Sequence, residues 1–425
     1  MTFLLSVVNY IGSLYVPQRS SEDLREAAFS AACGPLPMTP QSVQGLLLLV
    51  SAAMGEMQFD YQNHWTDRAI SMAMAIGMQH RAFADSASDA VQAECYRRVF
   101  WGLYFQDCTS ESRVGAKGTS LRQGAFDVDL PCEEWEYDAG RIPPPISLAQ
   151  YDLQNNLGSG EFSSWTYLID MARISSNLIL PYHDAPNEKK TELFERADAL
   201  ICDWLIRVPQ WKMDLVDAGG VADMILFHAM AFAQQNRLRI RQCASRQGLN
   251  LRQCFPLGPA MGPHRQAQKV KGFGWSAMPV EVQAANSVCS LFRQSFPIRN
   301  LSPRCLPGLL RVSLAYLDAC VFLGLDTPAF REKLNMLLHI MTVHGEIWAI
   351  SRKVAEEVRE VAKEYSLIPQ SPAPSSCGEM WVPGVTTGIA SDDTLQTSDF
   401  DFSIFPDISH LGDWTGSQNS QAPLV

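Results

Sequence analysis

The stretch of sequence that decides the fold is Glu94-Cys95-Tyr96-Arg97-Arg98-Val99-Phe100-Trp101-Gly102-Leu103-Tyr104-Phe105-Gln106-Asp107. Wound as a helix, it places Phe100, Tyr104 and Asp107 on one side. Aromatic groups of this size belong in a core, so Phe100 and Trp101 are predicted to be buried. A buried aspartate requires a partner, because an unpaired buried charge costs several kcal/mol. We therefore predict a core helix with an arginine within salt-bridge reach of Asp107.

Three arginines and three aspartates around this helix are the candidate ion pairs. We expect Arg97, Arg98 and Arg113 to partner Asp107, Asp127 and Asp129. Residues 126–131, Phe-Asp-Val-Asp-Leu-Pro, form the most strand-like segment of the chain, but the segment is short and ends in proline. The favoured interpretation is a structural ion-pair network that fixes helices to a loop. Catalysis by these carboxylates is the alternative.

Helical periodicity continues on both sides of this stretch. Thr39 is a predicted N-cap followed by Pro40 at the first helical position, and Gly77 is a predicted C-cap. Between them, apolar residues recur at steps of three and four, as expected for helices with one apolar stripe each. Further helices are predicted over residues 1–16, 97–110, 187–208, 222–243 and 307–323 and, as one long helix, over 328–365.

These patterns predict an all-α protein with one large, irregular multi-helix domain over residues 1–365. Apolar residues make up 47% of the 425-residue chain, which suffices for a large core. Residues 366–425 differ, because Ser, Pro, Gly and Asp prevail there. Beyond Lys363 there is no Lys or Arg, and eight acidic side chains supply most of the net charge of −11. This composition predicts a disordered acidic tail.

Within the tail, acidic residues alternate with large apolar ones. Phe400, Phe402, Phe405 and Trp414 stand among aspartates whose mutual repulsion opposes collapse into a private core. The aromatic groups then remain available to an apolar groove on a coactivator. We predict an activation segment here, and an inert tail is the alternative.

Several classes of function lack support in the sequence. There is no basic domain able to neutralise many phosphates, no C-x-x-C pair among the eleven cysteines, and no G-x-S-x-G, P-loop or H-E-x-x-H motif. His339 and His344 are five residues apart, which is the wrong spacing for two metal ligands on one helix face. The apolar first sixteen residues are too short to span a membrane. The basic stretch Arg237–Arg241 is either a nuclear-import signal or a polar surface.

The decisive stretch resembles the signature of the regulatory domain of fungal zinc-cluster transcription factors. In that signature an acid precedes paired arginines, Phe-Trp and an aspartate, and a loop rich in aspartate follows. The matching residues are Glu94, Arg97, Arg98, Phe100, Trp101, Asp107, Ser110, Gly115, Asp127, Asp129, Leu130 and Pro131. Weaker likenesses lie in residues 44–54, 65–81 and 203–209. The chain departs from the family in having Ala116-Lys117 where an Arg-Pro turn is expected, and in lacking a six-cysteine zinc cluster.

The resemblance implies a nuclear regulator of fungal genes, such as those of a metabolic or secondary-metabolite cluster. It also implies no cofactor in this chain, no enzymatic activity, no membrane association and no specific DNA binding by this chain alone. A DNA-binding transcription factor, a coactivator and a small-molecule effector are the expected partners. Two accounts of the missing cluster stay open: a complete protein that borrows a DNA-binding partner, or a piece of a longer one. The rival function is a helical enzyme that acts on a lipid or isoprenoid.

Overall fold

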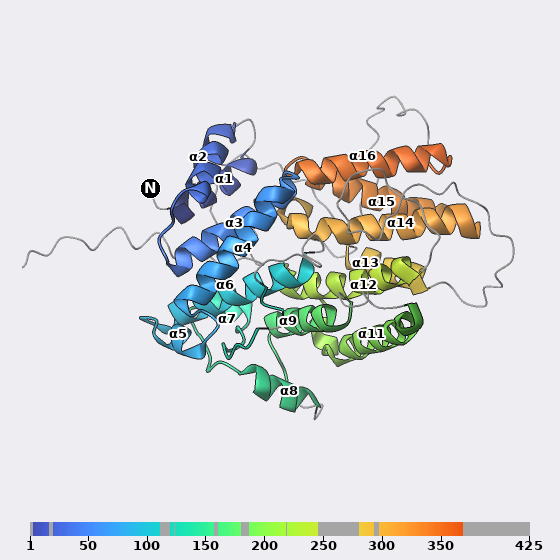
Figure 1. The fold of residues 1–425 in the computed structure, drawn as a ribbon. Helices are drawn as coiled ribbons and strands as arrows, with labels where there is room; N and C mark the ends of the chain where they lie inside the picture. Colours follow the sequence, from blue (N-terminus) through green and yellow to red (C-terminus); the bar gives the residue numbers. More distant parts are fainter. Residues whose placement is uncertain are drawn as a thin grey trace, which may run out of the picture.

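The computed structural model describes residues 3–368 except 17–19, 111–119, 123, 157–159, 180–186, 218, 245–279 and 293–296. The described part is all-α, as predicted, and its only β-type pairings are the isolated bridges Leu130–Ile146 and Val216–Ala222 (Figure 1). The helices, with the π-helix η2 and the short 3-10 helices η3 to η5, are α1 Phe3–Leu14, α2 Glu22–Cys33, α3 Pro40–Gly55, α4 Phe59–Ile76, α5 Arg81–Asp85, α6 Ala90–Thr109, α7 Glu134–Asp138, α8 Leu148–Asn156, α9 Ser164–Ile174, η2 Ser175–Ile179, α11 Asn187–Arg207, η3 Gln210–Lys212, α12 Met224–Ala244, α13 Val280–Leu291, η4 Ile298–Asn300, η5 Pro303–Cys305, α14 Leu306–Leu323, α15 Pro328–His344 and α16 Ala349–Glu364.

The helices pack side by side in an order that largely follows the chain. In Figure 1, α1 to α6 occupy one side of the molecule, and α11 to α16 form a stack on the other. Within that stack, α16 packs on α15, α15 on α14, and α14 on both α13 and α12. The two sides meet where α3 contacts η5 and α16. Helix α9 also joins them, because it contacts α6 on one side and α12 on the other.

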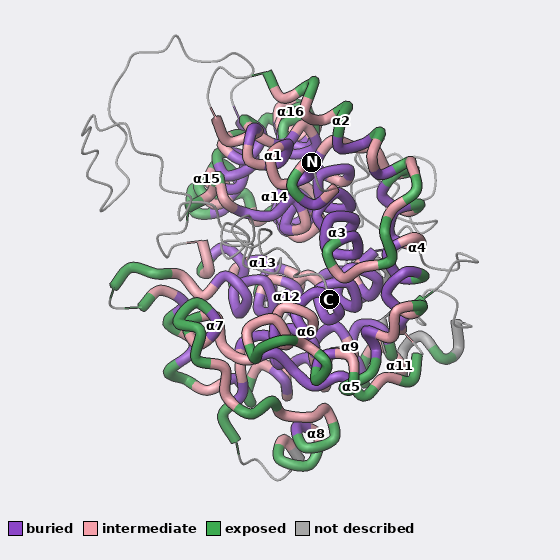
Figure 2. The backbone as a smooth tube through the Cα atoms, turned by 90° about the vertical axis from the view of Figure 1, so that its left-hand side faces the viewer, coloured by how far each residue is buried: buried purple, intermediate pink, exposed green. Residues whose placement is uncertain are grey.

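Two helices lie at the centre of the core. Helix α3 begins after the predicted N-cap, because the Thr39 side chain accepts a hydrogen bond from the Ser42 amide. Its apolar residues were expected on one stripe, but almost every residue from Ser42 to Gly55 is buried, as Figure 2 shows for α3. Helix α6 is likewise buried on all sides over its second half. Both are therefore central helices, which explains why polar groups on them need partners.

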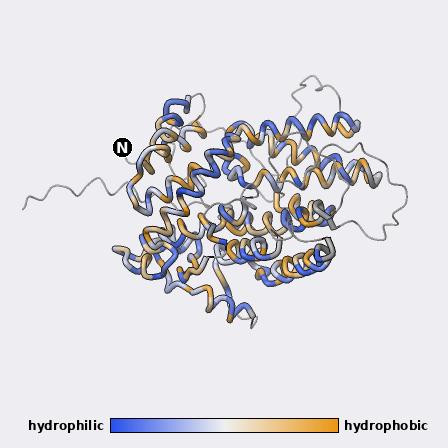
Figure 3. The backbone as a smooth tube through the Cα atoms, viewed as in Figure 1, coloured by the Kyte–Doolittle hydropathy of each residue, from blue (hydrophilic) through white to orange (hydrophobic). Residues whose placement is uncertain are grey.

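Most predicted helices are present, with two corrections. Helix α6 begins seven residues before the predicted start at Arg97, because Asp89 caps it by accepting a hydrogen bond from the Gln92 amide. The predicted single helix over 328–365 is wrong, because the chain turns between α15 and α16. Each of the two helices still shows the expected amphipathic pattern, which is clearest for α16, the helix at the upper right of Figure 3.

Close packing explains the break between α15 and α16. A side chain on Gly345 would meet the backbone nitrogen of Arg352 at 2.9 Å, so glycine lets the two helices approach at the turn. Trp348, the N-cap residue of α16, is buried against Gly55 of α3, where no other side chain would fit. In the described residues, no helix has the length and hydrophobicity needed to cross a membrane.

Candidate functional site

The acid of the signature, Glu94, lies between the paired arginines. Its carboxylate accepts hydrogen bonds from the Arg97 Nε at 2.8 Å and from the Arg98 Nε at 3.0 Å. It also accepts one from the Cys132 amide at 2.9 Å. All three charged side chains are almost fully buried. The spacing of three and four residues on α6 makes this arrangement possible, because such residues share one face of a helix.

Arg98 extends this network to the following loop. Its guanidinium forms an ion pair with Glu134 at the start of α7 and donates to the Glu133 carbonyl at 3.2 Å. The guanidinium also lies over the ring of Tyr137, 4.1 Å from the centroid. Burial alone would lower the pKa of Arg98, but the Glu134 and Glu94 carboxylates more than offset this effect and raise it. Arg98 therefore stays charged and joins α6 to α7.

A second set of charges continues the network to α12. Lys212 pairs with Glu133 and donates to the Ser164 hydroxyl at 3.0 Å. That hydroxyl donates in turn to Asp223 at 2.5 Å. The charges are thus occupied by one another, and the arrangement ties α6, α7, α9 and α12 together. It fits the predicted structural network.

The structure assigns other partners to the three aspartates than the sequence suggested. Asp107 is fully buried, lies 3.9 Å from Arg122 Nε, and accepts hydrogen bonds from Ser120 and the Leu121 amide. The expectation of an arginine near Asp107 is correct, but in the part of the chain that is described, Arg97 and Arg98 pair with glutamates instead. Arg113 lies outside the described residues.

The other two aspartates belong to the loop that follows. Asp129 pairs with Arg81 at 2.7 Å, and Asp127 with His80 at 3.0 Å. The Asp129 carbonyl accepts from the Trp101 indole at 2.8 Å, so the loop is fastened to α6. These partners lie at the start of α5, which sequence spacing alone did not indicate.

The remaining signature residues are structural as well. Phe100 and Trp101 are fully buried, as predicted, and both rings pack edge-on against Phe126. Leu130 is buried and forms the bridge to Ile146, and the Pro131 carbonyl accepts a hydrogen bond from Ser163 at 2.6 Å. Ser110 is buried at the end of α6. The other predicted site residues, Gly115 of the signature and Phe400, Phe402, Phe405 and Trp414 of the tail, lie outside the described residues.

The two histidines of α15 do not form a metal site, and the described part of the basic stretch of α12 does not form an exposed import signal. His344 is buried, with its ring nitrogens 2.7 Å from the Ser351 hydroxyl and from the Leu301 carbonyl, whereas His339 is exposed. Within the basic stretch, Arg237 pairs with Asp198 at 2.8 Å and Arg239 is buried. Neither arginine is therefore available to an import receptor in this fold.

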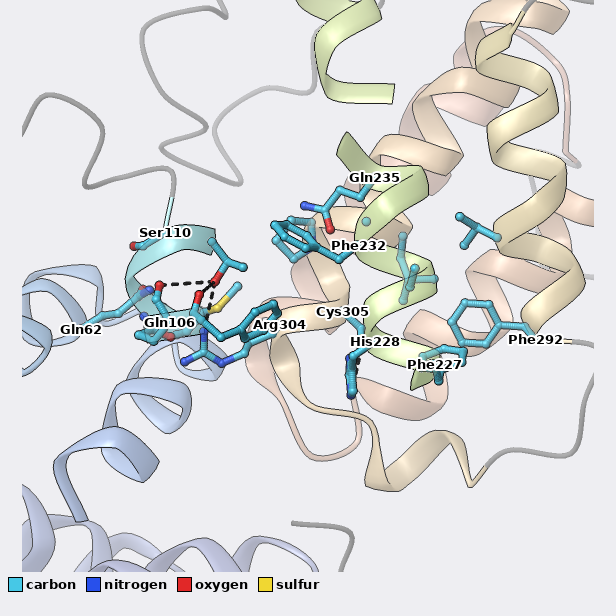
Figure 4. A pocket seen from close by; sticks show the side chains of 18 of the residues that line it. Gln62, Gln106, Ser110, Phe227, His228, Phe232, Gln235, Phe292, Arg304 and Cys305 are labelled. Carbon is cyan, nitrogen blue, oxygen red and sulfur yellow. Dashed lines mark hydrogen bonds between the residues drawn. The ribbon is translucent and has the colours of Figure 1, made fainter. Parts of the chain in front are cut away.

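A pocket lies where the end of α6 meets α12 and the start of α14. It has a volume of about 90 Å³, and no carboxylate lines it in the described part of the chain. In Figure 4, Gln62, Gln106 and Ser110 gather on the side of Arg304, and Phe227 and Phe292 lie on the other. The pocket therefore has a polar and an apolar side.

A cysteine and a histidine meet in the wall of this pocket. The Cys305 Sγ lies 3.2 Å from the His228 Nδ1, a pairing that catalytic cysteines also show. Burial and the nearby Arg304 lower the pKa of His228 to about 3, which makes its imidazole a poor general base. No third described side chain orients His228, and no group of metal-ligating residues occurs among the described residues. The pocket thus favours binding over chemistry.

Comparison with known proteins finds a family match over the part of the chain that contains the signature. Residues 2–210, which include the whole signature, match the fungal specific transcription factor domain. This similarity covers 209 of the 425 residues. The match ends at Gln210, so Glu94, Arg97, Arg98 and Glu134 of the network lie inside it, whereas Lys212, Asp223 and α12 lie beyond it. The pocket takes one wall from the matched region and the other from α12 to α14.

The chain also resembles a curated transcription factor over most of its length. The C6 finger domain transcription factor iacK of Pestalotiopsis fici is 22% identical over 414 residues, which cover 93% of this chain and 59% of that protein. The chain thus spans less than two thirds of that relative's length. No solved structure matches. Both matches are to transcription factors, which supports the prediction of a transcription regulator, whereas neither match supports the lipid or isoprenoid enzyme.

Proposed function

We propose that this chain regulates transcription in the fungal nucleus through its helical body, and that it is not an enzyme. The observation that carries the proposal is the family match over residues 2–210, which contain the buried Glu94, Arg97 and Arg98 of the network and their partner Glu134. In this reading the network has a mechanical role. It holds α6, α7, α9 and α12 in one arrangement, and that arrangement builds the surface that partners recognise.

A DNA-binding partner is part of this proposal. The sequence contains no six-cysteine array, and its positive charges are not concentrated in a recognition element. The arginines of the one basic stretch that the structure describes are buried or paired. We therefore expect the chain to reach promoters through a zinc-cluster protein, and its acidic tail to contact a coactivator.

Chromatin immunoprecipitation combined with gel-shift assays tests this function. An epitope-tagged chain in a fungal host is expected in nuclei, at discrete promoters. The purified chain is expected to shift none of the recovered promoter fragments at physiological salt. The same tag on an unrelated cytosolic protein is the control. Absence of the chain from chromatin would refute the proposal, and specific shifts by the pure chain would refute the need for a partner.

A further inference from the structure

The inference begins with Arg304, whose positive charge has no acidic partner. Its Nε donates to the Ser51 hydroxyl at 3.2 Å and its Nη1 to the Thr109 hydroxyl at 3.5 Å, and both acceptors are neutral. No described carboxylate lines the pocket or pairs with this guanidinium. Burial lowers the pKa of Arg304 to about 9, so the group is still charged at neutral pH. A buried charge without a counter-charge is costly, and it calls for an anion.

Gln106 supplies a second unsatisfied group in the same pocket. Its side chain is buried, and neither its Oε1 nor its Nε2 has a hydrogen-bond partner. Buried amides in native proteins are normally bonded, so an unbonded one that faces a cavity marks a place for a ligand. Figure 4 shows Gln106 on the same side of the pocket as Arg304. Together they offer guanidinium and amide N–H donors, the set that binds a carboxylate.

The rest of the pocket limits what accompanies the carboxylate. Phe227 and Phe292 pack edge-on with their centroids 5.2 Å apart and form the apolar side. The volume of about 90 Å³ is small, so we expect a short, flexible aliphatic chain beside the carboxylate.

We propose that this pocket binds a short-chain aliphatic carboxylate, with its anionic group on Arg304 and Gln106 and its chain against Phe227 and Phe292. The ligand would bridge α6, which belongs to the transcription factor domain, and α12, which follows it. Binding would thereby favour the arrangement in which these helices are packed together. That this occupancy regulates transcription rests on the proposed function, whereas the binding itself does not.

Isothermal titration calorimetry of the full chain with hexanoate tests the proposal. Hexanamide, the neutral counterpart, and inorganic phosphate, an anion without a chain, are the comparison ligands. Hexanoate is expected to bind at least about tenfold more tightly than either, because only it matches both sides of the pocket. Equal affinity for hexanamide, or no hexanoate binding, would overturn the proposal.

Three variants separate binding from folding. Arg304→Met is expected to weaken hexanoate binding at least tenfold while leaving the melting temperature of the free protein unchanged or higher, because it removes an uncompensated buried charge. Gln106→Met should weaken binding and keep the fold, and Arg299→Met, which removes an exposed arginine outside the pocket, should bind normally. Unchanged binding in both Arg304→Met and Gln106→Met would overturn the proposal. If binding holds but the chain is absent from promoters, only the proposed function fails.

Discussion

The signature network can be tested by removing its central acid. Glu94 is 1% exposed and accepts three hydrogen bonds, two of them from arginines. In Glu94→Ala, Arg97 keeps no acidic partner among the described residues, and Arg98 keeps only Glu134. Breaking a buried pair by removing one partner costs about 3–5 kcal/mol, because a charge remains buried without compensation. We therefore expect a loss of about that size.

Urea denaturation, followed by circular dichroism at 222 nm, measures this loss at pH 7. The matched control is Glu346→Gln, which breaks the exposed pair with Arg299 and should change the free energy of unfolding by less than about 1 kcal/mol. Glu94→Gln keeps the shape of the side chain, and its loss in free energy of unfolding should lie between those of the other two variants. A loss below about 1 kcal/mol for Glu94→Ala would refute the reasoning, since it would mean that the network contributes little to the fold.

Three further predictions concern the core, acid stability and the tail. Phe100→Ala should cost about 3–5 kcal/mol in the same assay, because the ring is fully buried, and a loss near 1 kcal/mol would contradict this. Burial lowers the pKa of His344 to about 4, so the neutral side chain contributes fully to the free energy of unfolding above pH 6.5. That contribution, about 3 kcal/mol, should be lost as the pH falls toward 4, and the loss should be absent in His344→Asn. Residues 391–416 fused to an unrelated DNA-binding domain should activate a reporter, and replacing Phe400, Phe402 and Phe405 by Ala should abolish most of the signal.

Local patterns were sufficient to predict the class of fold and most helices. The N-cap at Thr39 and the left-handed C-cap at Gly77, with φ of 88°, act through neighbours in the sequence, so they are visible there. The break after α15 was not predicted, because the apolar pattern runs through it. It depends on Trp348 packing against Gly55, a contact between residues far apart in the chain.

The candidate site was harder to predict for the same reason. The family resemblance placed Glu94, Arg97 and Arg98 in one signature, but the two arginines were expected to pair with aspartates. The sequence also did not show that Glu134, 36 residues after Arg98, completes the network. The pocket gave no local signal at all, because Arg304 and Thr109 are 195 residues apart. Only the packing of α6 against the later helices reveals that the arginine lacks a counter-charge.

The central claim is that the helical body itself regulates transcription, and recruitment to a promoter tests it most directly. Residues 1–368, fused to an unrelated DNA-binding domain in a fungal host, are placed at a reporter gene, and the reporter transcript is quantified. We predict a severalfold change relative to the DNA-binding domain alone, with most of the change lost in Glu94→Ala because the body is no longer held together. A transcript level equal to that of the DNA-binding domain alone, while immunoprecipitation shows the intact fusion at the promoter, would contradict the account.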